Sequence, residues 1–157
     1  MVAFTVPGEP QGKGRPRFAR AGNYVRTYTP EKTASYENLV KLEYERQCGG
    51  FRFKDDEPIF MFVRAFLSVP KSTSKKKREL MLNGLLVPIK KPDYDNIEKI
   101  ISDSLNEIAY KDDAQICDAL LQKRYSEIPR VEVELHSINE IYKQLRNGLE
   151  KEVRICG

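Results

Sequence analysis

The sequence predicts a small α+β domain in which a mixed β-sheet is flanked by helices. Apolar patterns typical of strands recur along the chain, near residues 2–6, 59–69, 115–125 and 130–135. Segments with helical periodicity separate or follow them, at residues 30–48, 75–83, 96–108 and from 138 onward. A chain of 157 residues, 40% hydrophobic and 32% charged, can bury one core, and no shift in composition marks a second domain.

The N-terminal part combines a short strand with a basic segment. Val2 to Val6 alternates as a strand, whereas the glycines and prolines between Pro7 and Arg17 exclude a regular element. Residues 11–26 are therefore expected to form a loop, with aromatic residues between five basic ones, Lys13, Arg15, Arg17, Arg20 and Arg26. Arginine forks bind phosphate and aromatic rings stack on bases, so this loop could follow a nucleic-acid backbone. A solvated basic loop is the alternative.

The next elements are a long helix and the most apolar strand. We expect the helix to start with Thr29 as N-cap and Pro30 at its first position, and to end at Gly49-Gly50. The strand at 59–69 carries apolar side chains on both faces. This predicts a central strand that is covered on both sides.

A second basic cluster follows, on a short helix expected from Lys75 to Asn83. Its members are Lys71, Lys75, Lys76, Lys77 and Arg78. A run of charge on a short helix is normally a solvated face. Because this run precedes an acidic motif, it could instead position phosphates, which set register and affinity without reading sequence.

The acidic motif at residues 91–96 reads Lys-Pro-Asp-Tyr-Asp-Asn. Pro92 favours extended chain, in which the side chains of Asp93 and Asp95 point the same way. A helix should follow, with Asp95 as N-cap and Glu98 as its capping-box partner. Its apolar face comprises Ile97, Ile100, Ile101, Leu105 and Ile108.

The opposite face of this helix presents two acids and a lysine. Asp95, Lys99 and Asp103 are successive i,i+4 neighbours there, and Asp112 and Asp113 can return to the same end of the helix. Magnesium takes oxygen ligands from a few carboxylates, waters and substrate phosphates, so the acids together predict a metal site. Each acid also has a structural alternative, as a helix cap, a solvated strip or a turn.

The C-terminal part returns to strands. Residues 115–125 and 130–135 are expected to be joined as a hairpin, the second with one buried and one wet face. Ser137 to Glu140 is a capping box, so about 137–157 should be a helical extension.

The stretch KPDYDNIEKIISDSLNEIAYKDDAQI, with PQGKGRPR near the N-terminus, resembles the RusA family of Holliday-junction resolvases, which phages and prophages often carry. The family pattern is KPDxDN, a lysine on the following helix, and an aspartate pair before a small residue and Gln. The match extends to about Leu135 and implies a single RusA-like nuclease domain over residues 1–157.

This resemblance implies a magnesium-dependent homodimeric endonuclease, with Mn²⁺ as an alternative ion, that nicks four-way DNA junctions symmetrically in recombination and repair. The family's essential acids correspond to Asp93, Asp95 and Asp113 and its essential lysine to Lys99, with Asp112 a close second to Asp113. The expected metal ligands are Asp93, Asp95, Asp113 and Asp112. The expected DNA-binding residues are Lys13, Arg15, Arg17, Arg20, Lys75, Lys76 and Lys77.

Several alternatives stay open at this point. They are a nuclease for flaps or branched DNA in general, a junction-binding protein without catalysis, and a ribonuclease. The number of metal ions and the dimer surface are also open, with the helix from Pro30 and the C-terminal helix as candidates for that surface.

Composition and missing motifs argue against several other kinds of protein and site. Cys48, Cys117 and Cys156 are odd in number and form no C-x-x-C, which indicates reduced thiols in a cytoplasmic protein. The single His136 argues against a histidine-based metal site. No apolar run approaches the ~18 residues of a membrane span, and no signal peptide is expected. The absence of P-loop and Rossmann patterns predicts no organic cofactor. The net charge of +4 is modest for a DNA-coating protein.

Overall fold

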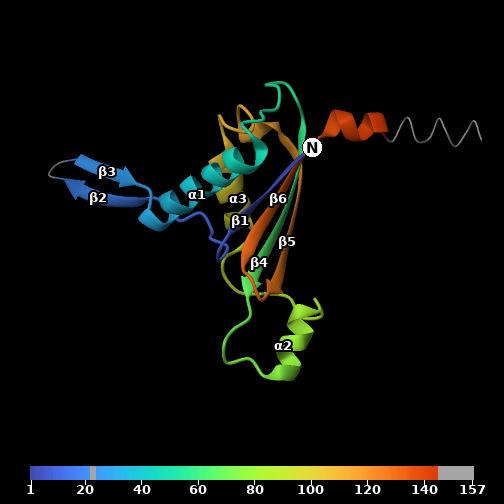
Figure 1. Ribbon diagram of the computed structural model, residues 1–157. Helices are drawn as coiled ribbons and strands as arrows, with labels where there is room; N and C mark the ends of the chain where they lie inside the picture. Colours follow the sequence, from blue (N-terminus) through green and yellow to red (C-terminus); the bar gives the residue numbers. More distant parts are fainter. Residues whose placement is uncertain (22–23, 145–157) are drawn as a thin grey trace, which may run out of the picture.

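The structure is a computed structural model that describes residues 1–21 and 24–144 (Figure 1). Strands and helices are interspersed along the chain, which confirms the predicted α+β class. The elements in chain order are β1 (Val2–Pro7), β2 (Arg17–Ala21), β3 (Tyr24–Tyr28), α1 (Glu31–Cys48), β4 (Ile59–Ser68), α2 (Lys75–Leu82), α3 (Tyr94–Leu105), the 3₁₀ helix η1 (Asp113–Gln115), β5 (Ile116–Ser126) and β6 (Arg130–Ser137).

The main sheet has four strands in the order β1-β6-β4-β5. β6 is antiparallel to both β1 and β4, whereas β4 and β5 run parallel, so the sheet is mixed. The predicted hairpin between β5 and β6 is wrong, because β4 lies between them. β6 pairs with β1 on one side and β4 on the other, and its alternate residues Val131, Val133 and Leu135 are fully buried.

Helices α1 and α3 cover one face of this sheet (Figure 1). The isoleucine stripe predicted for α3 is its buried face, because Ile97, Ile100 and Ile101 are fully buried. These side chains join one core with inward-facing residues of the strands, including Val6, Met61, Val63 and Val133. The core therefore fixes the rotation of α3 and turns its polar face away from the sheet.

The outward face of β4 differs from the prediction that both sides are covered. Phe60, Phe62 and Phe66 point outward there and are only partly buried. The Arg64 guanidinium lies 5.3 Å from the centroid of the Phe62 ring, and that of Arg130 lies 4.0 Å from the centroid of the Phe66 ring. Guanidinium groups thus shield Phe62 and Phe66, and the His136 ring lies 5.9 Å from the ring of Phe60. Within the described part of the chain, side chains of the sheet itself cover these rings.

Helix α1 begins one residue later than expected. Pro30, not Thr29, is the N-cap residue, and no side chain caps the helix. The Pro30 carbonyl accepts the first hydrogen bonds, from the N–H groups of Thr33 and Ala34. Gly49 ends the helix as predicted, with a left-handed φ of 62°.

The basic segment, expected to be a loop, is partly a two-stranded ribbon. β2 and β3 pair antiparallel, with Arg17 opposite Tyr28 and Ala21 opposite Tyr24. The ribbon projects away from the sheet beside the start of α1 (Figure 1). Glycines and prolines before residue 17 obscured the alternation that follows them.

The segment before this ribbon lies against two helices, and glycines allow the approach. A Cβ on Gly14 would lie 2.6 Å from Oγ1 of Thr33, to which the Gly14 N–H donates. A Cβ on Gly12 would lie 3.0 Å from Cβ of Asn96. The N–H of Lys13 also donates to the Asn96 carbonyl at 2.8 Å. The N-terminal segment is thereby joined to the first turn of α3.

The C-terminal extension is described only at its start. Residues 138–144 are helical, and the N–H of Glu140 donates to Oγ of Ser137 at 3.4 Å, which is one of the two hydrogen bonds of a capping box. The Glu140 carboxylate lies 3.6 Å from the N-terminal ammonium group. The remainder of the predicted extension lies outside the described residues.

Two smaller predictions concern the thiols and the membrane. Cys48 and Cys117 are free thiols, and Cys156 lies outside the described residues. Of the helices that the structure describes, none is long and apolar enough to cross a membrane.

Candidate functional site

The acidic motif lies where the chain enters α3. Asp93 is the N-cap residue, and its carbonyl accepts from the N–H of Ile97 at 3.1 Å. The predicted cap at Asp95 is therefore two residues too late, and Asp95 and Glu98 form no capping box. Asp95 lies in the first helical turn, where the helix dipole favours an anion. The side chains of Asp95 and Glu98 both project from the surface of α3.

A lysine of the sheet holds the chain just before these acids. Nζ of Lys123, in β5, donates to the backbone carbonyls of Lys90 at 2.6 Å and Pro92 at 2.8 Å. These carbonyls lie three residues and one residue before Asp93. Lys123 therefore fixes the backbone that leads into α3.

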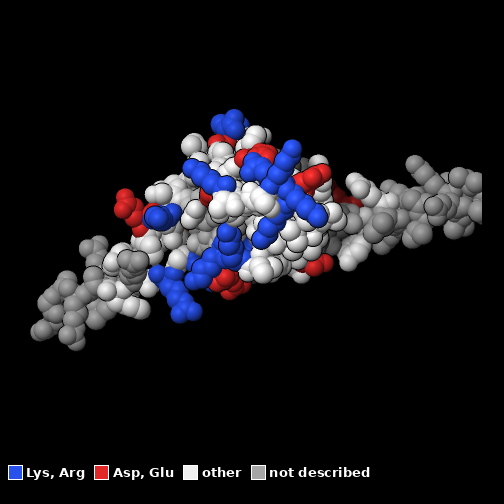
Figure 2. All heavy atoms as spheres, turned by 90° about the horizontal axis from the view of Figure 1, so that it is seen from below, with Lys and Arg blue, Asp and Glu red and all other residues white. Residues whose placement is uncertain are grey.

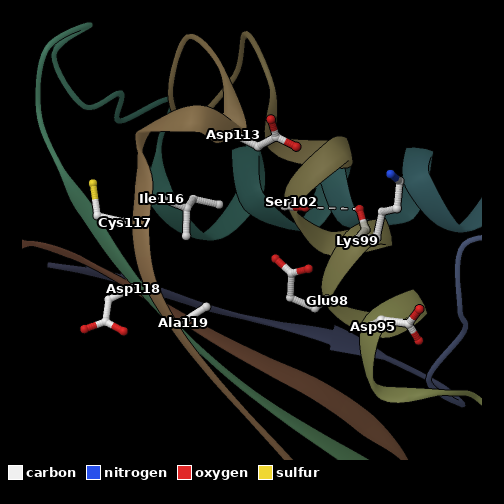
Figure 3. Close-up of a pocket in the computed structure, with 9 residues that line it drawn as sticks. All are labelled: Asp95, Glu98, Lys99, Ser102, Asp113, Ile116, Cys117, Asp118 and Ala119. Atoms are coloured by element: carbon white, nitrogen blue, oxygen red, sulfur yellow. Dashed lines mark hydrogen bonds between the residues drawn. The ribbon is translucent and has the colours of Figure 1, made fainter.

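Residues of α3, η1 and β5 line an open pocket of ≈ 460 Å³. Polar members of the lining are Asp95, Glu98, Lys99, Ser102, Asp113 and Asp118. In Figure 3, Glu98 lies between Asp95 and Asp113, with its carboxylate in the space between α3 and β5. The Asp118 carboxylate points to the other side of β5 (Figure 3). Three acids and Lys99 therefore line one pocket, with the Lys99 side chain extending on the side of α3 away from β5 (Figure 3).

Burial and mutual repulsion act on these acids in the same direction. Partial burial raises the pKa of Glu98, and the negative charges of Asp113 and Asp103 raise it further, while Lys99 opposes them. Burial also raises the pKa of Asp113, followed by the charges of Asp112 and Asp103. A cation bound between these carboxylates would reduce their mutual repulsion.

The predicted metal ligands divide between two places. Asp95 and Asp113 line the same pocket, whereas Asp93 lines a neighbouring one with Gly12 and Asn96. Asp112 is the N-cap of η1, and its Oδ1 accepts from an N–H at 2.9 Å. Within residues 1–21 and 24–144, no three His, Cys, Asp or Glu side chains are grouped closely enough to hold a metal ion as they stand.

The donor set of the pocket nevertheless fits a hard divalent cation. Asp95, Glu98 and Asp113 offer carboxylate oxygens, the ligand type that Mg²⁺ and Mn²⁺ prefer. Magnesium commonly takes only one or two protein carboxylates and fills its remaining positions with waters and substrate phosphate oxygens. A pocket with few converged protein ligands is therefore compatible with such an ion.

Comparison with known proteins gives the family. Residues 7–136 match the family model of Endodeoxyribonuclease RusA, a range that contains α3, η1 and most of the sheet. The chain belongs to the RusA endodeoxyribonuclease family. It is also 39% identical over 140 residues to the uncharacterized protein YqaN of Bacillus subtilis (strain 168), covering 88% of this chain and 97% of that protein. The predicted resemblance is confirmed, and membership of RusA supports a nuclease that acts on DNA.

This RusA chain presents basic residues on two surfaces. Arg15 is exposed before the β2–β3 ribbon, and Lys75, Lys76 and Lys77 are exposed on α2. Figure 2 shows the molecule from below, and Lys and Arg side chains are gathered across the face that it shows. Arg17 and Arg20 belong to β2, but their side chains lie outside the described part of the structure.

Lys13 has its ammonium group engaged within the protein. Its Nζ lies 2.9 Å from Oδ2 of Asp103 and also pairs with Glu37. Partial burial by itself lowers the pKa of Lys13, but the two carboxylates outweigh it and the pKa is raised. Lys13 thereby joins the N-terminal segment to α1 and α3.

Lys99 is exposed, and Asp103, one of its two acidic i,i+4 neighbours on α3, pairs with Lys13. Among the residues that the structure describes, Lys99 forms no ion pair, so its ammonium group remains available at the pocket of this RusA site.

Sequence reasoning missed Glu98, which lines the candidate pocket, and Lys123, which holds the backbone that leads to it. Glu98 carried a signal, because it follows Asp95 by three residues and so shares its helix face, but the capping-box interpretation gave it another role. Lys123 carried none, since its contact with Pro92 joins residues 31 apart in sequence.

Proposed function

We propose that the protein is a magnesium-dependent, structure-specific endonuclease that resolves four-way DNA junctions by paired symmetric nicks. One observation carries this proposal. Asp113, from η1, lines the same pocket as Asp95, Glu98 and Lys99 of α3, in a chain of the RusA family. An acid from a distant segment is what a shared metal site requires and what three separate helix caps or turns would not produce.

The residues of the pocket have distinct roles in this proposal. Asp95 and Asp113, with Glu98 between them, would hold the cation, and Asp93 and Asp112 flank them. A bound divalent ion supplies an activated water and neutralises charge on phosphate oxygens. Lys99 offers its ammonium group to the scissile phosphate or to the leaving oxygen.

Binding rests on other residues. The exposed lysines of α2 and Arg15 contact phosphates, which sets affinity and register without reading the sequence. A four-way junction offers two equivalent strands, and a twofold dimer with one pocket per subunit matches that symmetry. Homodimer formation is therefore part of the proposal, and light scattering of the purified protein tests it.

The test is cutting of a synthetic four-way junction with each strand labelled in turn, with and without Mg²⁺ or Mn²⁺. We expect symmetric nicks in two opposed strands with the metal. Asp113→Asn should lower the cutting rate at least about hundredfold, as loss of a charge-stabilising group does, while junction binding remains.

Control variants distinguish the site from a general charge effect. Asp56→Asn removes an exposed acid that lines a different pocket and should cut normally. Asp112→Asn and Asp93→Asn show whether the flanking acids contribute. Near-normal cutting by Asp113→Asn would overturn the assigned site, and equal cutting of flaps and junctions would replace resolution by a general branched-DNA nuclease.

A further inference from the structure

The segment between α2 and the acidic motif exposes a group of large apolar side chains. Ile89 is 96% exposed and Leu85 is 71% exposed. Leu86 and Val87 in the same segment, and Leu82 at the end of α2, are also exposed. This apolar segment, Leu85–Ile89, adjoins α2, which extends beyond the edge of the sheet (Figure 1). Several large apolar side chains exposed close together along the chain indicate an interaction site more strongly than a single exposed residue does.

The apolar segment is anchored at both ends. At its start, the N–H groups of Leu85 and Leu86 donate to the Leu80 carbonyl at 2.9 and 3.2 Å, which joins the segment to α2. Just past its end, the Lys90 carbonyl accepts from Lys123 at 2.6 Å. The exposed side chains are therefore presented by a fixed backbone, which lowers the entropic cost of binding.

The charge around the segment indicates its partner. Between residues 71 and 91 there are seven basic residues and one acid, Glu79. Within the described chain only Arg78 of these basic residues forms an ion pair, with Glu127. A twofold contact with a second copy through this segment would bring two sets of lysines together, which charge repulsion opposes. A polyanion with exposed apolar faces fits better, and DNA with unstacked bases has both properties.

We propose that Leu85–Ile89 contacts the unstacked bases at the branch point of a DNA junction; this inference rests on the function proposed above. Leucine and isoleucine are among the side chains that insert between base steps. At a branch point stacking is already interrupted, so insertion there costs less than in a continuous duplex. The lysines on either side of the segment hold the phosphates of the adjoining arms.

The position of the segment along the chain suits this role. Ile89 precedes Asp93 by four residues, so the two Cα atoms are at most about 14 Å apart. With 3.4 Å per base pair along a strand, this is the length of about four base pairs. Contact of Ile89 with the branch point would therefore place Asp93, at the start of α3, within a few nucleotides of it. Asp95 and Glu98 follow in the same helix, which links recognition of the branch to the place of cutting.

The test compares Leu85→Ser/Ile89→Ser with Leu42→Ser, which replaces an exposed leucine of α1. Each variant carries Asp113→Asn to prevent cutting. Affinities for a four-way junction and for a linear duplex with the same arm sequence are measured by fluorescence anisotropy. A 2-aminopurine at the branch reports unstacking.

We expect the double substitution to weaken junction binding at least about tenfold, or about 1.4 kcal/mol, and to remove the 2-aminopurine response. Duplex affinity should stay within about twofold, since the lysines are intact, and Leu42→Ser should match the parent.

Unchanged junction affinity, or equal loss on junction and duplex, would overturn the inference while leaving the nuclease proposal standing. Loss of self-association in the double variant, or binding of the parent to phosphatidylserine vesicles that depends on the segment, would assign the segment to another partner. Failure of the parent protein to bind any junction would overturn both proposals.

Discussion

Lys123 gives the sharpest test of how the sheet positions the acids. Lys123→Met keeps the length of the side chain but removes the ammonium group that donates to the carbonyls of Lys90 and Pro92. The backbone entering α3 at Asp93 would lose both bonds. We therefore expect a loss of stability together with a loss of cutting, although Lys123 does not line the acidic pocket.

The magnitude follows from the two bonds. The bond to Pro92 is partly buried and comes from a charged donor, so its loss should cost about 1.5–2 kcal/mol. The bond to Lys90 is exposed and water can replace the donor, so it should add about 0.5–1 kcal/mol. A total of about 2–3 kcal/mol corresponds to a Tm lower by about 4–12 °C for a domain of this size.

Thermal unfolding followed by circular dichroism measures the stability term. Hydrogen exchange of the amides at residues 90–97 should speed up more than that of the sheet. On a junction, kcat should fall by about tenfold with KM nearly unchanged, because the acids are misplaced while the basic surface is intact. Lys76→Met, an exposed lysine of α2, is the matched control for Tm. A Tm within about 1 °C of the parent, outside the range calculated above, would refute the reasoning.

Three further predictions concern other contacts. The folded-state pKa of Glu98 is raised from 4.5, so its charge weakens the fold as pH rises through and above that value. Glu98→Gln should therefore raise Tm at pH 7 without metal, and calorimetry should show the gain vanishing below about pH 4. Gly14→Ala should cost about 1–3 kcal/mol in urea unfolding through its clash with buried Thr33, and Thr33→Ala should recover part of that loss. Replacing Lys75, Lys76 and Lys77 by alanine should flatten the dependence of log Kd on log salt by up to about 2.7; an unchanged slope would exclude α2 from DNA contact.

The sequence predicted those elements whose pattern is set by burial. The isoleucines of α3 recur at helical spacing because one face must pack on the sheet, and they are the buried residues. The end of α1 at Gly49 could also be predicted from local sequence, because the left-handed backbone conformation at that position favours glycine. Such features can be found in a single sequence because each depends on a few neighbouring residues.

The missed features depend on distant partners. Nothing near residues 115–135 shows that β4 separates β5 from β6, because strand order is set by which faces are buried together. The two aromatic-rich strands of the ribbon were hidden by the glycines before them. Lys13 appeared as one of several DNA-binding cations, but its partners Glu37 and Asp103 lie on two different helices.

The division between acids and lysines explains how an acidic pocket can serve a protein that must approach DNA. A phosphate about 6 Å from one carboxylate is repelled by about 3 kcal/mol at an effective dielectric constant of about 20, and Asp95, Glu98 and Asp113 act together. On the proposed mechanism, the scissile phosphate would therefore be kept out of the pocket without a cation, while the exposed lysines of α2 would still hold the arms of the junction. Metal should then control cutting more strongly than binding. Burial is the largest cause of the raised pKa values of Glu98 and Asp113, and the neighbouring carboxylates add to it, while Lys99 offsets part of the effect at Glu98. A bound cation, as proposed above, would relieve the repulsion between these acids.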